Sequence, residues 1–181
     1  PAAITDATVT AVGDRSVTSM WTVPDNGGSA VTGYTLEVST DGGTTWLVLS
    51  TDWYSITIDG SVATFFADDL DAGVTYSVRV LTTNVVGTSP VSNVMTFTAI
   101  TVPGAPTGLA PSLAGPTQVT LTWVAPNETG GSAITDYVVE YSNDSGSTWA
   151  TFADGTSTTL TAIVTGLGKG INYTFRVSAV N

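Results

Sequence analysis

The sequence predicts an all-β chain made of two β-sandwiches in tandem, and three observations support this. First, the stretch NGGSAVTGYTLEVSTDGGTTW, from Asn26 to Trp46, recurs in close copy as TGGSAITDYVVEYSNDSGSTW, from Thr129 to Trp149. Second, apolar and polar residues alternate inside both copies, which is the period of a strand with one buried face. Third, Gly, Pro and Asp separate the alternating segments, as turns between short strands require.

Each copy is preceded by a strand that ends in tryptophan, Val17–Trp21 in the first and Val119–Trp123 in the second. Both tryptophans alternate with polar neighbours, so we expect them in the core. A proline and a Gly-rich loop follow each strand. Ser19 stands where the second copy has Leu121, so the first core is expected to be thinner there, or the strand to be shifted.

The recurring stretch itself predicts a strand, a tight turn and a returning strand. Asp41–Gly43 and Asp144–Gly146 mark the turns, because glycine tolerates positive φ. Trp46 and Trp149 are expected on the returning strands, packed at the rim of each core. The alternating apolar positions are Tyr34, Leu36 and Val38 in the first copy and Tyr137, Val139 and Tyr141 in the second.

The last shared segment is LDAGVTYSVRVLTTN, Leu70–Asn84, which matches LGKGINYTFRVSAVN, Leu167–Asn181. In the first copy a turn and a final strand follow Asn84; in the second the sequence stops at Asn181. The second sandwich is therefore expected to lack its last strand and to expose an unpaired edge. We expect continuation of the chain beyond Asn181, or complementation of that edge by another segment, including self-assembly.

The repeat divides the chain into a domain at residues 1–100, a Pro/Gly linker at 101–106 and a C-terminally incomplete domain at 107–181. The chain reads as a piece of a longer polypeptide, so neighbouring domains of that polypeptide are the expected partners.

These landmarks, in the same order twice, resemble the fibronectin type III domain in its bacterial or phage form, over Ala7–Ala99 and Pro106–Asn181. The resemblance implies immunoglobulin-like sandwiches with core tryptophans. It also implies a tyrosine corner in each domain, in which a buried phenol finds a backbone partner. The implied core residues are Trp21, Tyr34, Leu70, Tyr76, Trp123, Tyr137, Leu167 and Tyr173.

Composition argues against several functions. A formal net charge of -11 argues against nucleic acid as a partner, and no apolar stretch is long enough for membrane insertion. The chain has no Cys and no His, which removes disulfides and the commonest catalytic groups, so we predict no enzyme activity and no cofactor. Asp68, Asp69 and Asp71 form the one acidic cluster considered for calcium, with a solvated turn as the preferred interpretation.

Four residues are candidates for interactions. Trp53 and Tyr54 lie in a segment that the second copy lacks, which we expect to be an inserted surface loop. Either local packing or stacking on glycans would explain them. Val85 and Val86 are apolar at the tip of the last hairpin and are candidates for contacts with other domains or subunits.

The leading functional prediction is a non-catalytic structural spacer and protein-interaction module of a larger extracellular, cell-surface or virion protein, with assembly into a fibre or sheath as one form. One alternative is a carbohydrate-binding or adhesive module that uses Trp53 and Tyr54, with Trp46 as a further candidate for stacking on a sugar. Another is an accessory domain of a secreted polysaccharide hydrolase.

Overall fold

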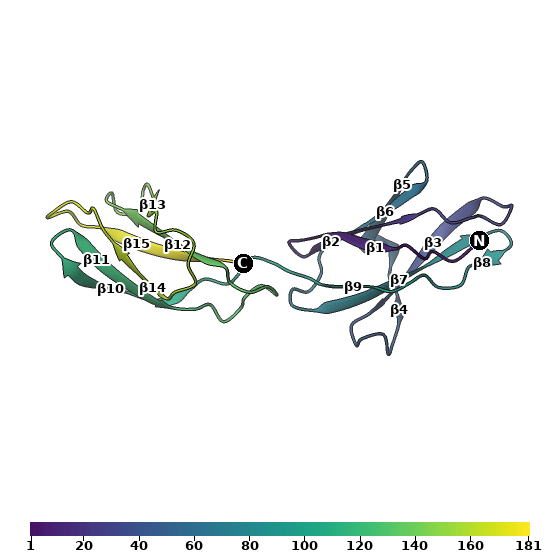
Figure 1. Cartoon of the computed structure of the whole chain (residues 1–181), viewed down its shortest axis with the longest axis horizontal. Coiled ribbons are helices and arrows are strands. Elements are labelled where there is room, and N and C mark those ends of the chain that lie inside the picture. Colours follow the sequence, from purple (N-terminus) through teal and green to yellow (C-terminus); the bar gives the residue numbers. More distant parts are fainter. The chain divides into compact units, whose positions relative to one another are not determined.

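The computed structural model describes all residues from 1 to 181 and divides into two compact units, Pro1–Thr101 (unit 1) and Val102–Asn181 (unit 2). Each unit is by itself a sandwich of two antiparallel sheets (Figure 1). No helix is long and apolar enough to cross a membrane.

Unit 1 has nine strands, and each sheet keeps one face on the core. One sheet has the order β1-β2-β6-β5; the other has the order β4-β3-β7-β8, with β9 also paired to β7. A single 3₁₀ turn, η1 (Thr51–Trp53), leads into β5. The strands are β1 (Thr8–Gly13), β2 (Ser16–Thr22), β3 (Val31–Ser39), β4 (Leu47–Val48), β5 (Tyr54–Asp59), β6 (Val62–Ala67), β7 (Thr75–Asn84), β8 (Gly87–Thr88) and β9 (Met95–Thr98).

Unit 2 has six strands in two three-stranded sheets, β10-β11-β14 and β13-β12-β15. It has no counterpart of β5, β8 or β9, and so β15 pairs with β12 on one side only. Its strands are β10 (Thr107–Gly115), β11 (Gln118–Val124), β12 (Asp136–Ser142), β13 (Ala150–Thr151), β14 (Thr161–Val164) and β15 (Thr174–Val180).

The register of β2 explains the exchange of Ser19 for Leu121. Ser19 is buried at 1% exposure and lies opposite Phe65 of β6, whereas Leu121 lies opposite Ala162 of β14. In each unit a small residue thus pairs with a large one. The small residue is on β2 in unit 1, whereas in unit 2 it is on β14. The strand is not shifted, and Phe65 supplies the volume that Ser19 lacks.

The segment around Trp53 differs from the inserted surface loop expected from the sequence. Only Thr51–Trp53 form a turn; Tyr54–Asp59 form β5, which pairs with β6 from Tyr54↔Ala67 to Asp59↔Val62. The loop expectation was therefore wrong for most of this segment. Backbone pairing with β6 makes it a fourth strand of the first sheet.

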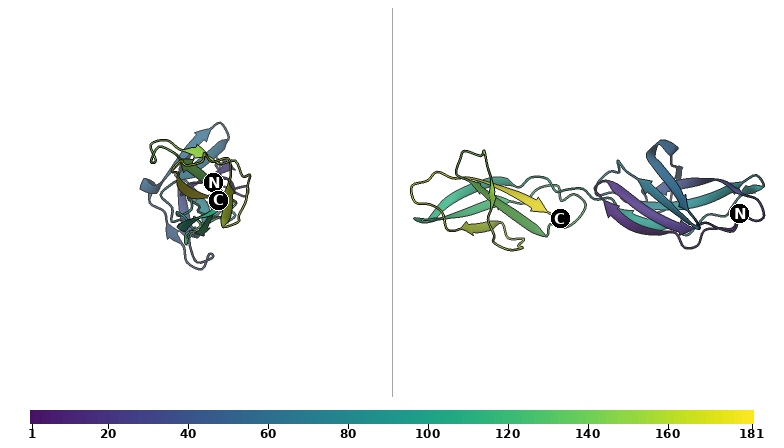
Figure 2. Two further views of the ribbon diagram at one scale, coloured as in Figure 1. Left: turned by 90° about the vertical axis from the view of Figure 1, so that its left-hand side faces the viewer. Right: turned by 90° about the horizontal axis from the view of Figure 1, so that it is seen from above.

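The two ends of unit 1 lie at opposite ends of its sandwich, as Figures 1 and 2 show. At one end Ala2 donates a backbone hydrogen bond to the carbonyl of Asp25, at 2.8 Å. At the other end Arg15 donates one to the carbonyl of Ile100, at 2.6 Å. Because β2 runs the length of the sandwich between these contacts, the chain enters and leaves unit 1 at different ends.

Candidate functional site

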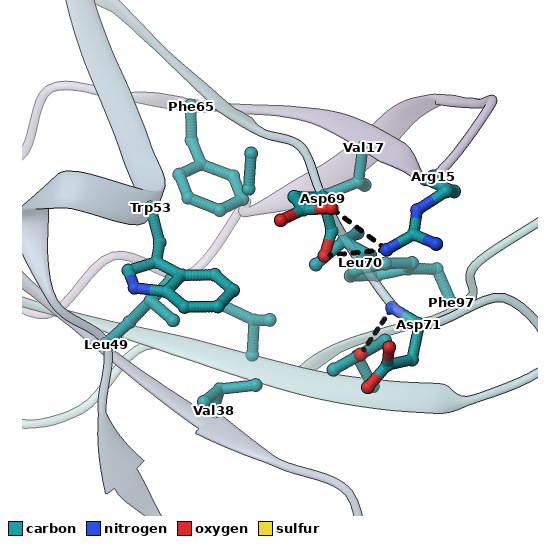
Figure 3. Close-up of a pocket in the computed structure, with 13 residues that line it drawn as sticks. Arg15, Val17, Val38, Leu49, Trp53, Phe65, Asp69, Leu70, Asp71 and Phe97 are labelled. Atoms are coloured by element: carbon teal, nitrogen blue, oxygen red, sulfur yellow. Dashed lines mark hydrogen bonds and ion pairs between the residues drawn. The ribbon is translucent and has the colours of Figure 1, made fainter.

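Unit 1 contains a pocket of about 260 Å³ between its two sheets (Figure 3). Strands β2 and β6 with η1 supply one wall, and β3, β7 and β9 supply the other. The turn before β7 closes one end. The lining residues are Arg15, Val17, Val38, Leu49, Trp53, Phe65, Ala67, Asp69, Leu70, Asp71, Tyr76, Val78 and Phe97.

The deep part of this pocket is apolar and fixed. Val17, Phe65 and Val78 are at most 3% exposed. Tyr76 stacks on Phe97 with ring centroids 5.7 Å apart and planes at 23°. These side chains belong to the packed core, so the pocket floor is preformed and does not need to open for a ligand.

The mouth of the pocket is charged. Arg15 Nη2 lies 2.9 Å from Asp69 Oδ1, and the Leu70 amide donates to the Arg15 carbonyl at 3.0 Å. Asp71 lies beside this pair and is exposed. Trp53, at 52% exposure, extends its indole toward the pocket from the opposite side (Figure 3).

Unit 2 carries larger side chains at two of the positions that line this pocket. In unit 1, Val38 lies opposite Val78 across β3 and β7. At the same place in unit 2, Tyr141 lies opposite Phe175 across β12 and β15, and Tyr141 meets Tyr173 edge-on at 6.0 Å. Two rings thus replace two valines.

A hollow of unit 2 overlaps the corresponding region and lies beside the unpaired edge of β15. Its lining includes counterparts of unit 1 pocket residues, namely Thr117, Val119, Leu167, Gly168, Tyr173 and Phe175. It measures about 330 Å³ and is lined by Pro111 and Leu113 of β10 and by the turn that leads to Phe175. Leu113 is 90% exposed and Ile171 is 49% exposed. In unit 1, β9 pairs with β7 at the corresponding edge.

The predicted core residues lie as follows. Trp21 packs edge-on against Tyr34 at 5.6 Å, and Trp123 packs against Tyr137 at 5.5 Å, both at 63°. Burial raises the pKa of Tyr34. The buried members of the predicted set are Trp21, Trp123, Tyr137 and Leu167, and the half-buried ones are Tyr34, Leu70, Tyr76 and Tyr173.

Each unit contains the same tyrosine contact before its long strand. The Tyr76 hydroxyl accepts a hydrogen bond from the Asp71 amide, and the Tyr173 hydroxyl accepts one from the Gly168 amide, both at 3.0 Å. In unit 2 the turn continues through Lys169, which is exposed and makes no ion pair.

The recurring Asp turns are built by side-chain hydrogen bonds. The Asp41 carboxylate accepts bonds from the Thr45 hydroxyl at 2.6 Å and amide at 2.9 Å, and from the Ser39 hydroxyl at 2.7 Å. These bonds lower its pKa to about 2. Asp144 makes the same arrangement with Ser142 and Thr148, and its pKa is also lowered to about 2.

Trp46 and Trp149 lie just before β4 and β13, rather than on those strands. An arginine side chain lies over the ring of each tryptophan. Arg79 lies 4.2 Å above the Trp46 ring and donates to Glu37 at 2.6 Å. Arg176 lies 4.3 Å above Trp149. It also binds Glu140, which lowers the pKa of that carboxyl. Each arginine covers one face of its indole ring, so that face is not open to a sugar.

The acidic cluster before β7 does not form a metal site in the structure. Asp69 faces Arg15, while Asp68 and Asp71 are exposed without converging on a common point. No group of three acidic side chains in the chain is placed to hold a metal ion. The calcium hypothesis therefore receives no support from the geometry.

The predicted interaction residues lie in two separate places. Trp53 lines the pocket, and Tyr54 packs its ring against Phe65 at 5.7 Å. Val85 and Val86 are 81% and 82% exposed in the turn between β7 and β8. Their role in contacts with other domains or subunits stays a prediction.

Trp53, Asp69, Leu70, Asp71 and Tyr76 were named from the sequence, but no pattern in it predicted that they line one pocket. A signal was present, because position 38 is Val where the second copy has Tyr141. The smaller side chain at position 38 indicates a cavity only when the residue that pairs with it on the neighbouring strand is also known.

Similarity to known proteins agrees with this architecture. The fibronectin type III domain family matches residues 2–98 and 104–181. Cardiac-type myosin-binding protein C of Mus musculus is 33% identical over 172 residues, covering 94% of this chain and 13% of the relative. The Gallus gallus protein is 29% identical over the same length and coverage. This chain thus spans about an eighth of these animal relatives, and none of these matches supports the expected bacterial or phage type.

Solved structures share the fold. Domains A168–A170 of titin align with a TM-score of 0.60 at 22% identity, covering 97% of this chain and 55% of that one. The FN1–FN3 domains of chicken CNTN1 align with a TM-score of 0.52 at 15% identity, covering 98% and 59%. With the family match over both halves, the chain belongs to the fibronectin type III family and carries two of its domains in succession.

Proposed function

We propose that this chain is a non-catalytic structural and protein-interaction module of a larger polypeptide. The observation that carries the proposal is the separation of the ends of unit 1: the chain enters beside Asp25 and leaves beside Arg15. A domain with this arrangement spaces whatever is attached on its two sides. Tension along the chain acts on strands that antiparallel hydrogen bonds hold at both ends of the sandwich.

The charges of the chain fit a non-catalytic role. The three arginines each pair with one carboxylate, and the two acidic groups with pKa values near 2 are structural parts of turns. Asp41 and Asp144 therefore stay ionised near neutral pH and hold the turns rather than transfer protons.

Single-molecule stretching of the 181-residue chain between two handles tests the spacer role. We expect two separate unfolding events, and the larger one should release about 350 Å of chain from unit 1, at roughly 3.5 Å per residue. The matched variant Leu36→Ala should lower the force of that event alone, because Leu36 is fully buried in unit 1. Extension of unit 1 without a force peak would contradict the proposal.

We also propose features of the whole protein that concern its location, its assembly and a glycan partner. An extracellular, cell-surface or virion location, and assembly into a fibre or sheath, are tested by fractionation and electron microscopy of the full-length parent protein. The glycan-binding alternative depends on Trp53, which is half-exposed. It predicts saturable binding on a glycan array that Trp53→Ala abolishes, and absence of binding by the unchanged chain would dismiss it.

A further inference from the structure

We propose that the pocket of unit 1 binds a small molecule that carries one aromatic ring and one ammonium group. The ring would lie between the sheets, and the ammonium group would lie at the mouth beside Asp71. This site does not depend on the spacer role, since it belongs to unit 1 alone.

The size and walls of the pocket indicate the ring. A dry apolar cavity of about 150 Å³ in another protein is large enough to bind benzene. The pocket here has about 260 Å³, with Val17, Phe65 and Val78 almost fully buried around it. It is therefore large enough for one ring and a short side arm.

The aromatic side chains indicate a ring in preference to an aliphatic chain. Trp53, Phe65, Tyr76 and Phe97 all line the pocket. Aromatic rings attract one another in stacked and edge-to-face arrangements beyond the burial of their area. The half-exposed indole of Trp53 lies where it could cover a bound ring (Figure 3).

The charges at the mouth indicate a cation. Arg15 is engaged by Asp69. The carboxylate of Asp71 accepts no hydrogen bond from a protein group, so it is available to a ligand. The excess of acidic residues in the chain, with a formal net charge of -11, adds a long-range attraction for cations.

Unit 2 carries larger side chains at two of the matching positions, and these residues supply the test variants. Val38→Tyr and Val78→Phe each introduce the residue that unit 2 carries at the matching position, Tyr141 or Phe175. Both changes are compatible with the fold, because unit 2 accommodates them. Val48→Tyr is the matched control, since Val48 is 68% exposed on β4 and does not line the pocket.

The experiment titrates the 181-residue chain with phenethylamine and with 3-phenylpropionate, by calorimetry and by amide chemical shifts. Phenethylamine is expected to bind, with shifts at Phe65 and Val78. Val38→Tyr and Val78→Phe should each weaken binding at least ten-fold, while Val48→Tyr leaves it unchanged. Binding that survives both filling variants, or absence of binding to the unchanged chain, would overturn the site.

The ammonium part has its own test. Asp71→Asn should weaken phenethylamine about two- to five-fold, the size expected for an exposed ion pair, and leave neutral benzyl alcohol unaffected. Asp59→Asn is the control, because it removes the same charge from β5, where Asp59 pairs with Val62 of β6 and does not line the pocket. If 3-phenylpropionate binds as tightly as phenethylamine, or if Asp71→Asn weakens benzyl alcohol equally, the assignment of a cation is wrong.

Discussion

Replacing Tyr173 by Phe tests how the tyrosine contact stabilises each unit. The change removes one hydroxyl that lies 3.0 Å from the Gly168 amide and leaves the ring in place. An intramolecular hydrogen bond contributes about 1 kcal/mol net, and more when its loss strands a buried partner. Gly168 is partly buried, so we expect Tyr173→Phe to lower the free energy of unfolding of unit 2 by about 1–1.5 kcal/mol.

The matching change in unit 1, Tyr76→Phe, should cost less. The partner amide belongs to Asp71, which is exposed and can bond to water after the change. Ring contacts do not decide the difference, because the Tyr76 ring keeps its stacking on Phe97 and the Tyr173 ring keeps its contact with Tyr141. We expect a loss of about 0.5–1 kcal/mol.

Differential scanning calorimetry of the 181-residue chain measures both changes. For a domain of this size, 1 kcal/mol corresponds to about 4–8 °C in Tm. Tyr173→Phe should therefore lower the Tm of the unit 2 transition by about 4–12 °C. Leu36→Ala in unit 1 identifies which transition is which. The reasoning is refuted if Tyr76→Phe costs more than Tyr173→Phe, or if neither change moves a transition.

Three further sets of substitutions would each remove a contact described above. Leu36→Ala should destabilise unit 1 by about 3–4 kcal/mol, because it empties a fully buried site, as urea unfolding would measure. Arg79→Met should destabilise unit 1 by about 1–2 kcal/mol, since it removes a partly buried ion pair and the cation above Trp46, and salt should diminish the effect only in part. The double variant Asp41→Asn/Asp144→Asn should have a lower Tm than the wild type above pH 4, as thermal unfolding over a range of pH would measure. Their folded pKa values of about 2 lie below the ordinary 3.8, so the stabilisation is present above pH 3.8 and is lost as the pH falls through 2, below which wild type and variant should converge.

Most of the fold could be predicted from local pattern. The alternation at Tyr34, Leu36 and Val38 and its copy indicated strands, and those residues lie on β3 and β12. The all-β class of two successive sandwiches, the second without its last strand, is confirmed. Repetition made this prediction strong, because two independent copies follow the same order of strands and turns.

The rest depends on contacts between distant segments. Tyr54–Asp59 became β5 because β6 offers a free edge, which the sequence of β5 alone does not reveal. The pocket likewise depends on Val38 and Val78 meeting across two strands. Each valine by itself is an ordinary strand residue. Only because the two small side chains lie opposite one another do they leave space for a cavity.

The turn after Gly168 offers a practical handle. Lys169 is the only lysine of the chain and stands exposed outside any ion pair. Amine-reactive dyes or resins would therefore modify one side chain, beside the start of β15 and away from Asn181. A fluorophore there would report on unit 2, the unit to which Lys169 belongs.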